Sequence, residues 1–419
     1  MRYFMGPGAG NRLKAAGCLA VLSLSPFSAF AIDFKIDLPP QKGVSTPDDA
    51  NFFDDVLSVS EGQSNSIMGS DENLNAAIPS PIPPASANVP AAQQKSFPST
   101  KETRGRSGVA NQSDKKSFAA DMSQFPNPSC LSENIAFWKR VYAEVDNQEA
   151  LIHDRDDLEK IYATVRLGGS EPQRQQSMRM LKEHYRQSLR SLSEKIDSPK
   201  NWNPTERSIA KFFRPSELTR SHLLQASENI RIQQGLKSRF NSGVQKSLQY
   251  LPTIKNIVKA QGLPLDIAFL PHVESSFVNH AKSKVGAVGL WQLMPQTMQL
   301  LLGRKAVNKR TDPQTATLAA TKLLKQNFDA TGSWPLALTA YNHGLAGVLR
   351  AVRSTGSTDL CKIIERYNSP SFRFASSNFY AQFLAARQIA LQRYTDLSKN
   401  REVGRIVAPL LASRDKGAL

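Results

Sequence analysis

One acidic residue lies in the stretch of the sequence that is richest in candidate functional groups. This stretch runs from Pro271 to Gln296 and reads PHVESSFVNHAKSKVGAVGLWQLMPQ, and Glu274 is the only carboxylate in it. An apolar run precedes Glu274 and a run rich in glycine follows it, and removal of a carboxyl group from water disfavours its charged form. The pattern therefore predicts a carboxyl group whose pKa is raised towards the range of a general acid. The charge pattern alone also fits an acid that is simply solvated at the end of a helix.

A second carboxylate, which glycoside hydrolysis ordinarily requires, is not evident near Glu274. Between Glu274 and Asp359 the sequence contains only Asp312 and Asp329 as acids. Asp312 precedes a proline in a helix-capping pattern and Asp329 lies near a predicted helix end, so both are interpreted as structural. An enzyme with one acid can still break a glycosidic bond if the substrate itself supplies the nucleophile.

Several short motifs follow Glu274 in a fixed order. The pair Glu274-Ser275 is followed by Ser283-x-x-Gly286-Ala-x-Gly289-Leu-Trp291-Gln292 and then by Ala340-Tyr341-Asn342. In this order and spacing the motifs resemble the lytic transglycosylases, which have a goose-type lysozyme fold, and most closely the membrane-bound murein transglycosylase D-like branch. Several motifs in register are far more specific than one alone. The resemblance extends over roughly residues 130–394.

This resemblance implies a reaction and a role for each motif residue. Lytic transglycosylases cleave the β-1,4 bond between N-acetylmuramic acid and N-acetylglucosamine without water, leaving a 1,6-anhydro end. Glu274 would be the catalytic acid and base, and the remaining motif residues would bind the glycan: Ser275, Ser283, Gly289, Trp291, Gln292, Tyr341 and Asn342. Trp291 stands where other branches have methionine, and either a sugar-stacking or a core role is open. Gly286 and Gly289 would allow the backbone to approach the saccharide, or serve turn geometry alone.

No cofactor or metal is expected. His272, His280 and His343 flank the motifs, but the sequence contains no HExxH and no tight His/Cys cluster, so surface or hydrogen-bonding roles are favoured. Two departures from the family pattern concern targeting to the wall and support for the proposed acid. No small wall-binding repeat follows the catalytic module, and Ser376 stands where many relatives have a glutamate four residues before the tyrosine that matches Tyr380.

The start of the chain has the features of an export signal. Residues 1–31 combine a basic start, an apolar core and the small-x-small sequence Ala29-Phe30-Ala31, which predicts a cleavable signal peptide and a periplasmic protein. Cys18 lies in a sequence like a lipobox, but the apolar core mostly follows it, so cleavage after Ala31 is preferred. The mature chain would retain Cys130 and Cys361, either paired or as free thiols.

The next segment, residues 32–129, is rich in proline and serine and lacks apolar periodicity, which predicts a disordered tether. The tether is slightly acidic, whereas the chain carries +17 overall, so the positive charge is concentrated in the folded part. Secretion and the lack of RNA- or DNA-binding motifs argue against nucleic acid as the partner. Peptidoglycan strands, with peripheral association to a membrane or envelope machinery, fit this charge better, and a merely solvated basic surface is the alternative.

The elements that must position the motif residues are predicted to be helices, so the fold class is mostly α. A helical module over residues 130–251, expected to act only as scaffold, would precede a lysozyme-like catalytic domain over 252–400 and a tail over 401–419. In the module, helices are predicted after Ser132 and in the ranges 156–164, 173–195, 206–213 and 227–251, with Pro252 restarting a short helix. In the catalytic domain, helices are predicted over 265–275, disturbed by Pro271, from Pro295, from Asp312-Pro313 to Gly332, and from Pro335 to Asn342.

The sequence thus supports one preferred function and two alternatives. The preferred function is that of a lytic transglycosylase acting on peptidoglycan. A lysozyme-like hydrolase would use water in place of the intramolecular attack. A wall-binding scaffold of an envelope machine, with the fold kept and turnover weak, would also fit the basic folded part and the long tether.

Overall fold

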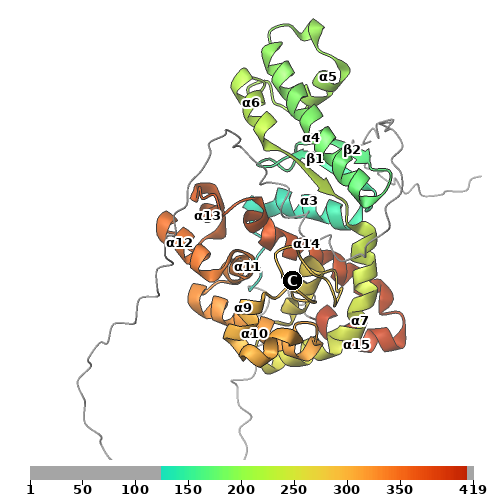
Figure 1. The fold of residues 1–419 in the computed structure, drawn as a ribbon, viewed down its shortest axis with the longest axis vertical. Helices are drawn as coiled ribbons and strands as arrows, with labels where there is room; N and C mark the ends of the chain where they lie inside the picture. Colours follow the sequence, from blue (N-terminus) through green and yellow to red (C-terminus); the bar gives the residue numbers. More distant parts are fainter. Residues whose placement is uncertain (1–123, 413–419) are drawn as a thin grey trace, which may run out of the picture.

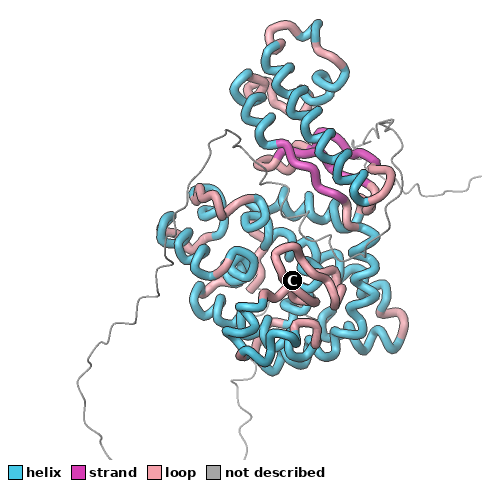
Figure 2. Tube along the Cα trace, in the orientation of Figure 1, coloured by secondary structure: helices cyan, strands magenta, loops and turns pink. Residues whose placement is uncertain are grey.

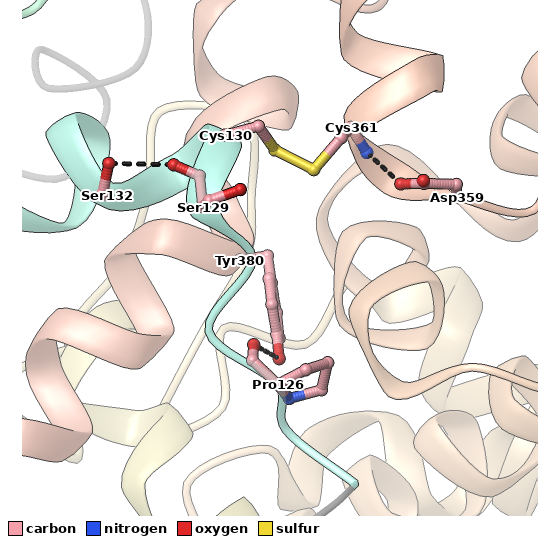
Figure 3. Close-up of a disulfide and its surroundings, with 7 residues drawn as sticks. All are labelled: Pro126, Ser129, Cys130, Ser132, Asp359, Cys361 and Tyr380. Carbon is pink, nitrogen blue, oxygen red and sulfur yellow. Dashed lines mark hydrogen bonds between the residues drawn. A yellow bond between two sulfur atoms is a disulfide. The ribbon is translucent and has the colours of Figure 1, made fainter.

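The computed structural model describes residues 124–412. The expected signal peptide and most of the expected tether therefore lie outside the described residues. The last residues of that tether range already pack on the folded part: Phe125 is buried between Trp334 and Phe383, with ring centroids 5.4 and 5.3 Å away. The carbonyl of Pro126 accepts a hydrogen bond from the Tyr380 hydroxyl, 2.8 Å away (Figure 3). Residues 124–129 of the expected tether range therefore belong to the folded part.

The predicted fold class is confirmed, since the described chain is mostly helical (Figure 1). The main body contains η1 (Ser129–Leu131), α3 (Ser132–Ala143), α7 (Lys237–Ala260), η3 (Leu265–Phe269), α8 (Leu270–Glu274), α9 (Pro295–Leu302), η4 (Arg304–Lys309), α10 (Pro313–Thr331), α11 (Trp334–His343), α12 (Leu345–Thr355), α13 (Leu360–Arg366), α14 (Phe374–Leu397) and α15 (Arg401–Leu411). None of the helices in residues 124–412 combines the length and the apolar character that a membrane crossing requires.

Helix α14 is the central element of the main body. It contacts α3, α7, α8, α11 and α15, and its buried residues lie on all sides of the helix, which is typical of a core helix. Helix α15 occupies much of the range expected to be a tail, and it packs on the body through Val407 and Leu410.

The module between α3 and α7 projects from the main body above α3 (Figure 1). It contains β1 (Glu149–Asp154), β2 (Ile161–Arg166), α4 (Glu171–Glu194), η2 (Pro199–Asn201), α5 (Pro204–Ala210), α6 (Arg220–Asn229) and β3 (Ile230–Gln234). The three strands form an antiparallel sheet in the order β2-β1-β3. In Figure 2 this sheet lies between the projecting helices and the main body.

Two helix predictions in this module are wrong because of the sheet. Residues 161–166 form β2 where a helix over 156–164 was predicted, and β3 interrupts the helix predicted over 227–251. Both segments are short and contain β-branched residues, and their backbone groups pair with the buried strand β1. Helix α7 also continues through Pro252, so the predicted restart at that residue is wrong. Burial of Leu251, Ile254 and Val258 offsets the cost of the internal proline, about 3 kcal/mol.

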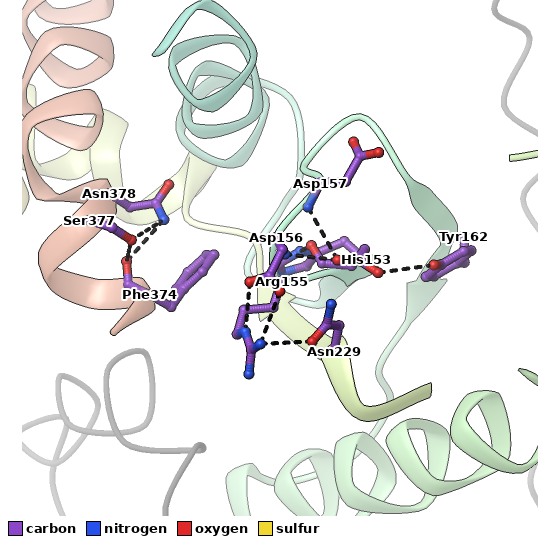
Figure 4. A network of polar contacts seen from close by, with 10 residues as sticks. His153, Arg155, Asp156, Asp157, Tyr162, Asn229, Phe374, Ser377 and Asn378 are labelled. Carbon is purple, nitrogen blue, oxygen red and sulfur yellow. Dashed lines mark hydrogen bonds and ion pairs between the residues drawn. The ribbon is translucent and has the colours of Figure 1, made fainter. Parts of the chain in front are cut away.

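A buried polar and aromatic contact joins the module to the main body (Figure 4). The ring of His153 on β1 packs against Phe137 of α3 and Phe374 of α14, at centroid distances of 4.6 and 5.8 Å. The guanidinium of Arg231 on β3 lies over the Phe374 ring, 4.2 Å from its centroid. The module is therefore attached through both α3 and α14.

A disulfide between Cys130 and Cys361 links the start of α3 to α13 (Figure 3). Their Cα atoms are 6.1 Å apart although the residues are separated by 231 positions in sequence, a distance within the usual range for a bridged pair. Of the two states left open by the sequence, the structure has the paired one.

Candidate active site

Glu274 is the last residue of α8 and is held there by an irregular turn. The segment 265–275 is helical and disturbed near Pro271 as predicted, since η3 passes into the short α8 at residue 270. Ser276 and Phe277 follow with φ angles of 49° and 56°, which non-glycine residues rarely adopt. Such backbone strain persists only where the surrounding structure fixes it, and it concentrates at functional sites.

Glu274 lies in a cleft of about 310 Å³. It is the only acid among the described residues that line this cleft, and Arg239 is the only permanently charged cation. The full lining consists of Trp138, Tyr142, Leu236, Arg239, His272, Val273, Glu274, Ser276, Ser283, Val285, Ala287, Gln292, Met294, Tyr341, Asn342, Phe379 and Gln382. A two-carboxylate mechanism therefore lacks its second carboxylate within this lining.

Burial raises the pKa of Glu274 to about 8, as the sequence predicts. Part of the side chain remains accessible from the cleft, but the dense protein around it removes most of the hydration of the carboxylate. Burial, and secondarily the charge of Glu274, raises the pKa of Tyr142 and of Tyr341 well above the usual value, which places both phenols close to this carboxyl group. At neutral pH the cleft therefore holds a protonated carboxylic acid that can donate a proton.

The loop after α8 brings Ser283 and Gln292 to the cleft. The Ser283 hydroxyl accepts a hydrogen bond from the backbone N–H of Ala287, 2.9 Å away. Gln292, with a φ of 45°, donates through Nε2 to the carbonyls of Gly289 and Ala281, at 2.9 and 3.2 Å. Both side chains are thus held by the loop itself while they face the cleft.

Three of the predicted substrate-binding residues do not line the cleft. The Ser275 hydroxyl is buried and donates to the carbonyl of Leu290, 2.9 Å away, so Ser275 fixes the loop against α8. Trp291 is fully buried and donates through Nε1 to Thr317, 3.0 Å away, which places it in the core and removes the sugar-stacking alternative. Gly289 has a φ of 88°, and a Cβ there would lie 2.2 Å from the carbonyl oxygen of Arg310, so its role is close backbone packing.

Tyr341 and Asn342 reach the cleft from the end of α11. The helix begins at Trp334, one residue before the predicted start, and extends one residue beyond Asn342. The Tyr341 hydroxyl donates to the carbonyl of Trp291, 2.7 Å away. Ser376 of α14 donates to Asn342 Oδ1 across 3.3 Å, so at the position where a supporting carboxylate was expected a neutral hydroxyl contacts the site.

The three histidines near the motifs have different environments. His272 is buried, shares a hydrogen bond with the Tyr394 hydroxyl at 2.9 Å, and burial lowers its pKa to about 3. His343 contacts the Ser376 hydroxyl at 3.0 Å, and His280 is exposed. In residues 124–412 the one grouping with metal-ligand spacing is the partly exposed set Glu133, Asp157 and Glu159, and none of these residues lines the cleft.

One wall of the cleft comes from segments in which the sequence motifs gave no site residue. Helix α3 supplies Trp138 and Tyr142, the start of α7 supplies Arg239, and α14 supplies Phe379 and Gln382. Residues 130–251 were expected to act only as scaffold, and some residues of this range, among them Trp138, Tyr142 and Arg239, line the cleft. The only sequence signal was the spacing of Trp138 and Tyr142 on one helical face, which equally predicts a core position.

The comparisons with known proteins agree with the motif region. Residues 252–364 match the family model of the transglycosylase SLT domain. The chain is similar to the membrane-bound lytic murein transglycosylase D of Escherichia coli (strain K12), with 31% identity over 121 residues, which cover 28% of this chain and 27% of that protein. It is also similar to a putative tributyltin chloride resistance protein of Alteromonas sp. (strain M-1), with 35% identity over 111 residues, which cover 25% of this chain and 51% of that protein.

The chain therefore aligns with about a quarter of the Escherichia coli relative and about half of the Alteromonas one. The range that matches the family model, residues 252–364, includes Glu274, the loop that holds Ser283 and Gln292, and the end of α11. The chain therefore carries a transglycosylase SLT domain over residues 252–364, and it is similar over part of its length to a lytic murein transglycosylase.

Proposed function

We propose that this protein is a peptidoglycan lytic transglycosylase that cleaves the β-1,4 bond between N-acetylmuramic acid and N-acetylglucosamine and leaves a 1,6-anhydromuramyl end. The observation that carries the proposal is one buried carboxyl group, Glu274, in a cleft whose lining contains no second acid among the described residues, and burial raises the pKa of this group. Hydrolysis by two carboxylates needs a partner for Glu274, whereas intramolecular attack does not.

In the first step, Glu274 donates its proton to the oxygen of the scissile bond as the bond to C1 of the muramyl residue breaks. The raised pKa keeps this proton on the carboxyl group at neutral pH. Asn342 and Tyr341 line the same cleft as Glu274, where they can orient the N-acetyl group and the ring on which positive charge develops.

In the second step, the C6 hydroxyl of the same muramyl residue attacks C1, and its proton passes to the Glu274 carboxylate. The leaving N-acetylglucosamine keeps the first proton, the new C6–O–C1 bond closes the anhydro ring, and Glu274 returns to its starting state. The nucleophile is part of the substrate, so the step gains the large advantage of an intramolecular reaction.

The cellular setting in this proposal is the periplasm, with the glycan strands of peptidoglycan as the partner and no nucleic acid. The predicted export signal in residues 1–31, the positive charge of +17 and the similarity to a protein named as membrane-bound support this setting. The positive charge favours an anionic wall and the membrane surface.

Digestion of purified sacculi followed by mass spectrometry tests the function. We expect 1,6-anhydromuramyl products from the wild type, and a fall of about 10²–10⁴-fold in their release for Glu274→Gln. Asp312→Asn is the matched control, since Asp312 only caps α10 through Thr315 and lies outside the cleft, and we expect its turnover to stay near wild type. Products with reducing ends only would identify a hydrolase. Equal binding of sacculi by wild type and Glu274→Gln, without soluble products from either, would identify a scaffold.

A further inference from the structure

A chain of three polar side chains ends at Asn342 in the cleft. Nδ1 of His343 lies 3.0 Å from the Ser376 hydroxyl, and that hydroxyl lies 3.3 Å from Oδ1 of Asn342. Asn342 lines the cleft, whereas Ser376 is buried on α14, and neither Ser376 nor His343 belongs to the described lining. The chain therefore supports a lining residue from behind, through two groups that do not face the cleft themselves.

The direction of these two hydrogen bonds depends on one proton, because a serine hydroxyl has only one to donate. Burial, assisted by the charge of Arg350, lowers the pKa of His343, so its ring is neutral at pH 7. If Ser376 donates to Oδ1 of Asn342, it accepts from His343, and the ring proton is on Nδ1. If the amide is turned round, its Nδ2 donates to Ser376, Ser376 donates to Nδ1, and the ring proton must be on Nε2. The two arrangements present opposite ends of the Asn342 amide to the cleft.

The surroundings of His343 Nε2 decide between the two arrangements. This nitrogen is buried and has no hydrogen-bond partner among residues 124–412. A Cβ on Gly347 would lie 2.5 Å from it, so an α-hydrogen of Gly347 points at this edge of the ring. A C–H group that faces a nitrogen lone pair is weakly attractive. A proton on Nε2 would instead face that hydrogen and leave a buried N–H group without an acceptor, which is costly. Nε2 is therefore the bare nitrogen, and Nδ1 carries the proton.

The groups at both ends of the chain are held in place. The His343 ring meets the ring of Phe372 edge to face, with centroids 5.1 Å apart. Tyr341, the neighbour of Asn342 on α11, donates through its hydroxyl to the carbonyl of Trp291, 2.7 Å away. Helix α11 also packs directly on α14, which carries the serine between the two ends. The chain can therefore fix the amide of Asn342 and not merely follow its movement.

We propose that His343 and Ser376 are positioning residues that turn the NH2 end of the Asn342 amide towards the cleft. Oδ1 of Asn342 is occupied by Ser376, so the end that remains for the substrate can only donate. Asn342 then selects a carbonyl oxygen, such as that of an N-acetyl group, and disfavours a donor in the same place. This inference rests on the proposed function for the identity of the substrate, whereas the order of the protons in the chain does not depend on it.

Nitrogen-15 NMR of protein labelled at histidine tests the order of the protons. The ring signals that disappear in His343→Asn belong to His343. We expect a protonated Nδ1 and a bare Nε2 for this ring in the wild type at pH 7. A proton on Nε2, alone or together with one on Nδ1, would overturn the proposal.

The release of 1,6-anhydromuramyl products from soluble glycan strands tests the effect on the reaction. We expect Ser376→Ala and His343→Leu each to lower kcat/KM about 10-fold, the loss typical of one misplaced hydrogen bond. The double variant should lose no more than Ser376→Ala alone, because both changes break the same chain. His343→Asn keeps an N–H donor near the position of Nδ1 and should stay within about 2-fold of the wild type. Ser377→Ala is the matched control, since Ser377 of the same helix donates to the carbonyl of Phe374.

Losses that add up in the double variant would overturn the proposal, and so would equal losses in His343→Asn and His343→Leu. If His343→Leu does not fold, the comparison of Ser376→Ala with Ser377→Ala still decides, because equal activity of these two variants would show that the Ser376 hydroxyl has no role of its own. A wild-type protein with the proton on Nδ1 that releases no anhydro products would refute the proposed function and leave the order of the protons in the chain standing.

Discussion

The raised pKa of Glu274 favours the proposed proton donation, but it lowers the stability of the folded protein at neutral and alkaline pH. The unfolded chain loses the Glu274 proton near its ordinary pKa of 4.5, whereas the folded protein holds it up to about pH 8. Above pH 4.5 the unfolded state is therefore favoured by ionisation, and this penalty on folding grows as the pH rises to about 8 and then stays constant. Below pH 4.5 the penalty is absent.

We therefore expect Glu274→Gln to be more stable than the wild type at pH 8.5 and nearly equal to it at pH 4. The amide has the size of the protonated acid but cannot ionise, so only the wild type has the penalty at high pH. Urea unfolding of both proteins at the two pH values measures the difference. A gap of the same size at both values would mean that the pKa of Glu274 is not raised.

Arg239 supports a second prediction at the scale of single residues. It is the one permanent cation among the described residues that line the cleft. Where a muramyl residue of peptidoglycan carries a peptide, the peptide bears carboxylates, and an arginine is well suited to bind them.

We expect Arg239→Gln to raise KM several-fold on glycan strands that carry peptides and to leave kcat within about 2-fold. Lys246→Gln removes the same charge from an exposed position of the same helix and serves as the control. Equal losses in both variants would assign the effect to net charge, and a fall in kcat alone would place Arg239 nearer the reacting atoms.

At the scale of elements, the helices with local end signals were predictable and the strands were not. Helix α10 has its limits where the sequence places them, because Asp312 accepts a hydrogen bond from the N–H of Thr315 at one end and Gly332 adopts a φ of 65° at the other. Strand β2 depends instead on pairing with β1. That pairing is a tertiary property which a local pattern does not encode.

The residues of the site also fall into a predictable and an unpredictable group. Glu274, Ser283, Gln292, Tyr341 and Asn342 were recognised because they belong to short motifs, and all five line the cleft. The wall from α3, α7 and α14 was missed because it forms through packing of distant segments, and a buried tyrosine in an amphipathic helix carries no local sign of its use. Trp291 was ambiguous for the same reason, and only the contact with Thr317 identifies it as core.

The disulfide supports a prediction about α3 and α13. Cys130→Ser combined with Cys361→Ser removes a link across 231 positions, which restricts the unfolded chain, so we expect the free energy of unfolding to fall by about 2–4 kcal/mol. Urea unfolding measures this loss. Reductant should produce a similar loss in the wild type and none in the double variant, and a double variant as stable as the wild type would contradict the expectation.

At the scale of the whole molecule, one buried histidine, His153, makes the junction between module and body sensitive to acid. Burial, assisted by the charge of Arg231, lowers the pKa of His153 from 6.5 to about 3. Below pH 6.5 the His153 imidazole is protonated in the unfolded chain but stays neutral in the folded protein. The contribution of this residue to stability therefore declines as the pH falls from about 6.5 towards 3.

We expect the difference in the free energy of unfolding between the wild type and His153→Phe to be smaller by about 2 kcal/mol at pH 5 than at pH 7. Phenylalanine fits between the rings of Phe137 and Phe374 but cannot be protonated in the unfolded state. The substitution removes the hydrogen bond between His153 Nδ1 and the Asp154 carbonyl, and this loss lowers stability at both pH values. Denaturant unfolding at the two values gives the gap, and a gap that does not change with pH would show that His153 is protonated in the folded protein.

The cleft is lined by segments from distant parts of the chain, and this limits which segment of the protein could be transferred to another protein with the cleft complete. Residues 252–364, which match the family model, hold the proposed acid, but other parts of the cleft lining come from helices that precede and follow this range in the chain. A chimera that received only this segment would inherit Glu274 without Tyr142, Arg239 and Gln382, and would expose the faces that α3 and α14 cover. The smallest segment that would carry the whole cleft lining therefore runs from the start of α3 to the end of α14.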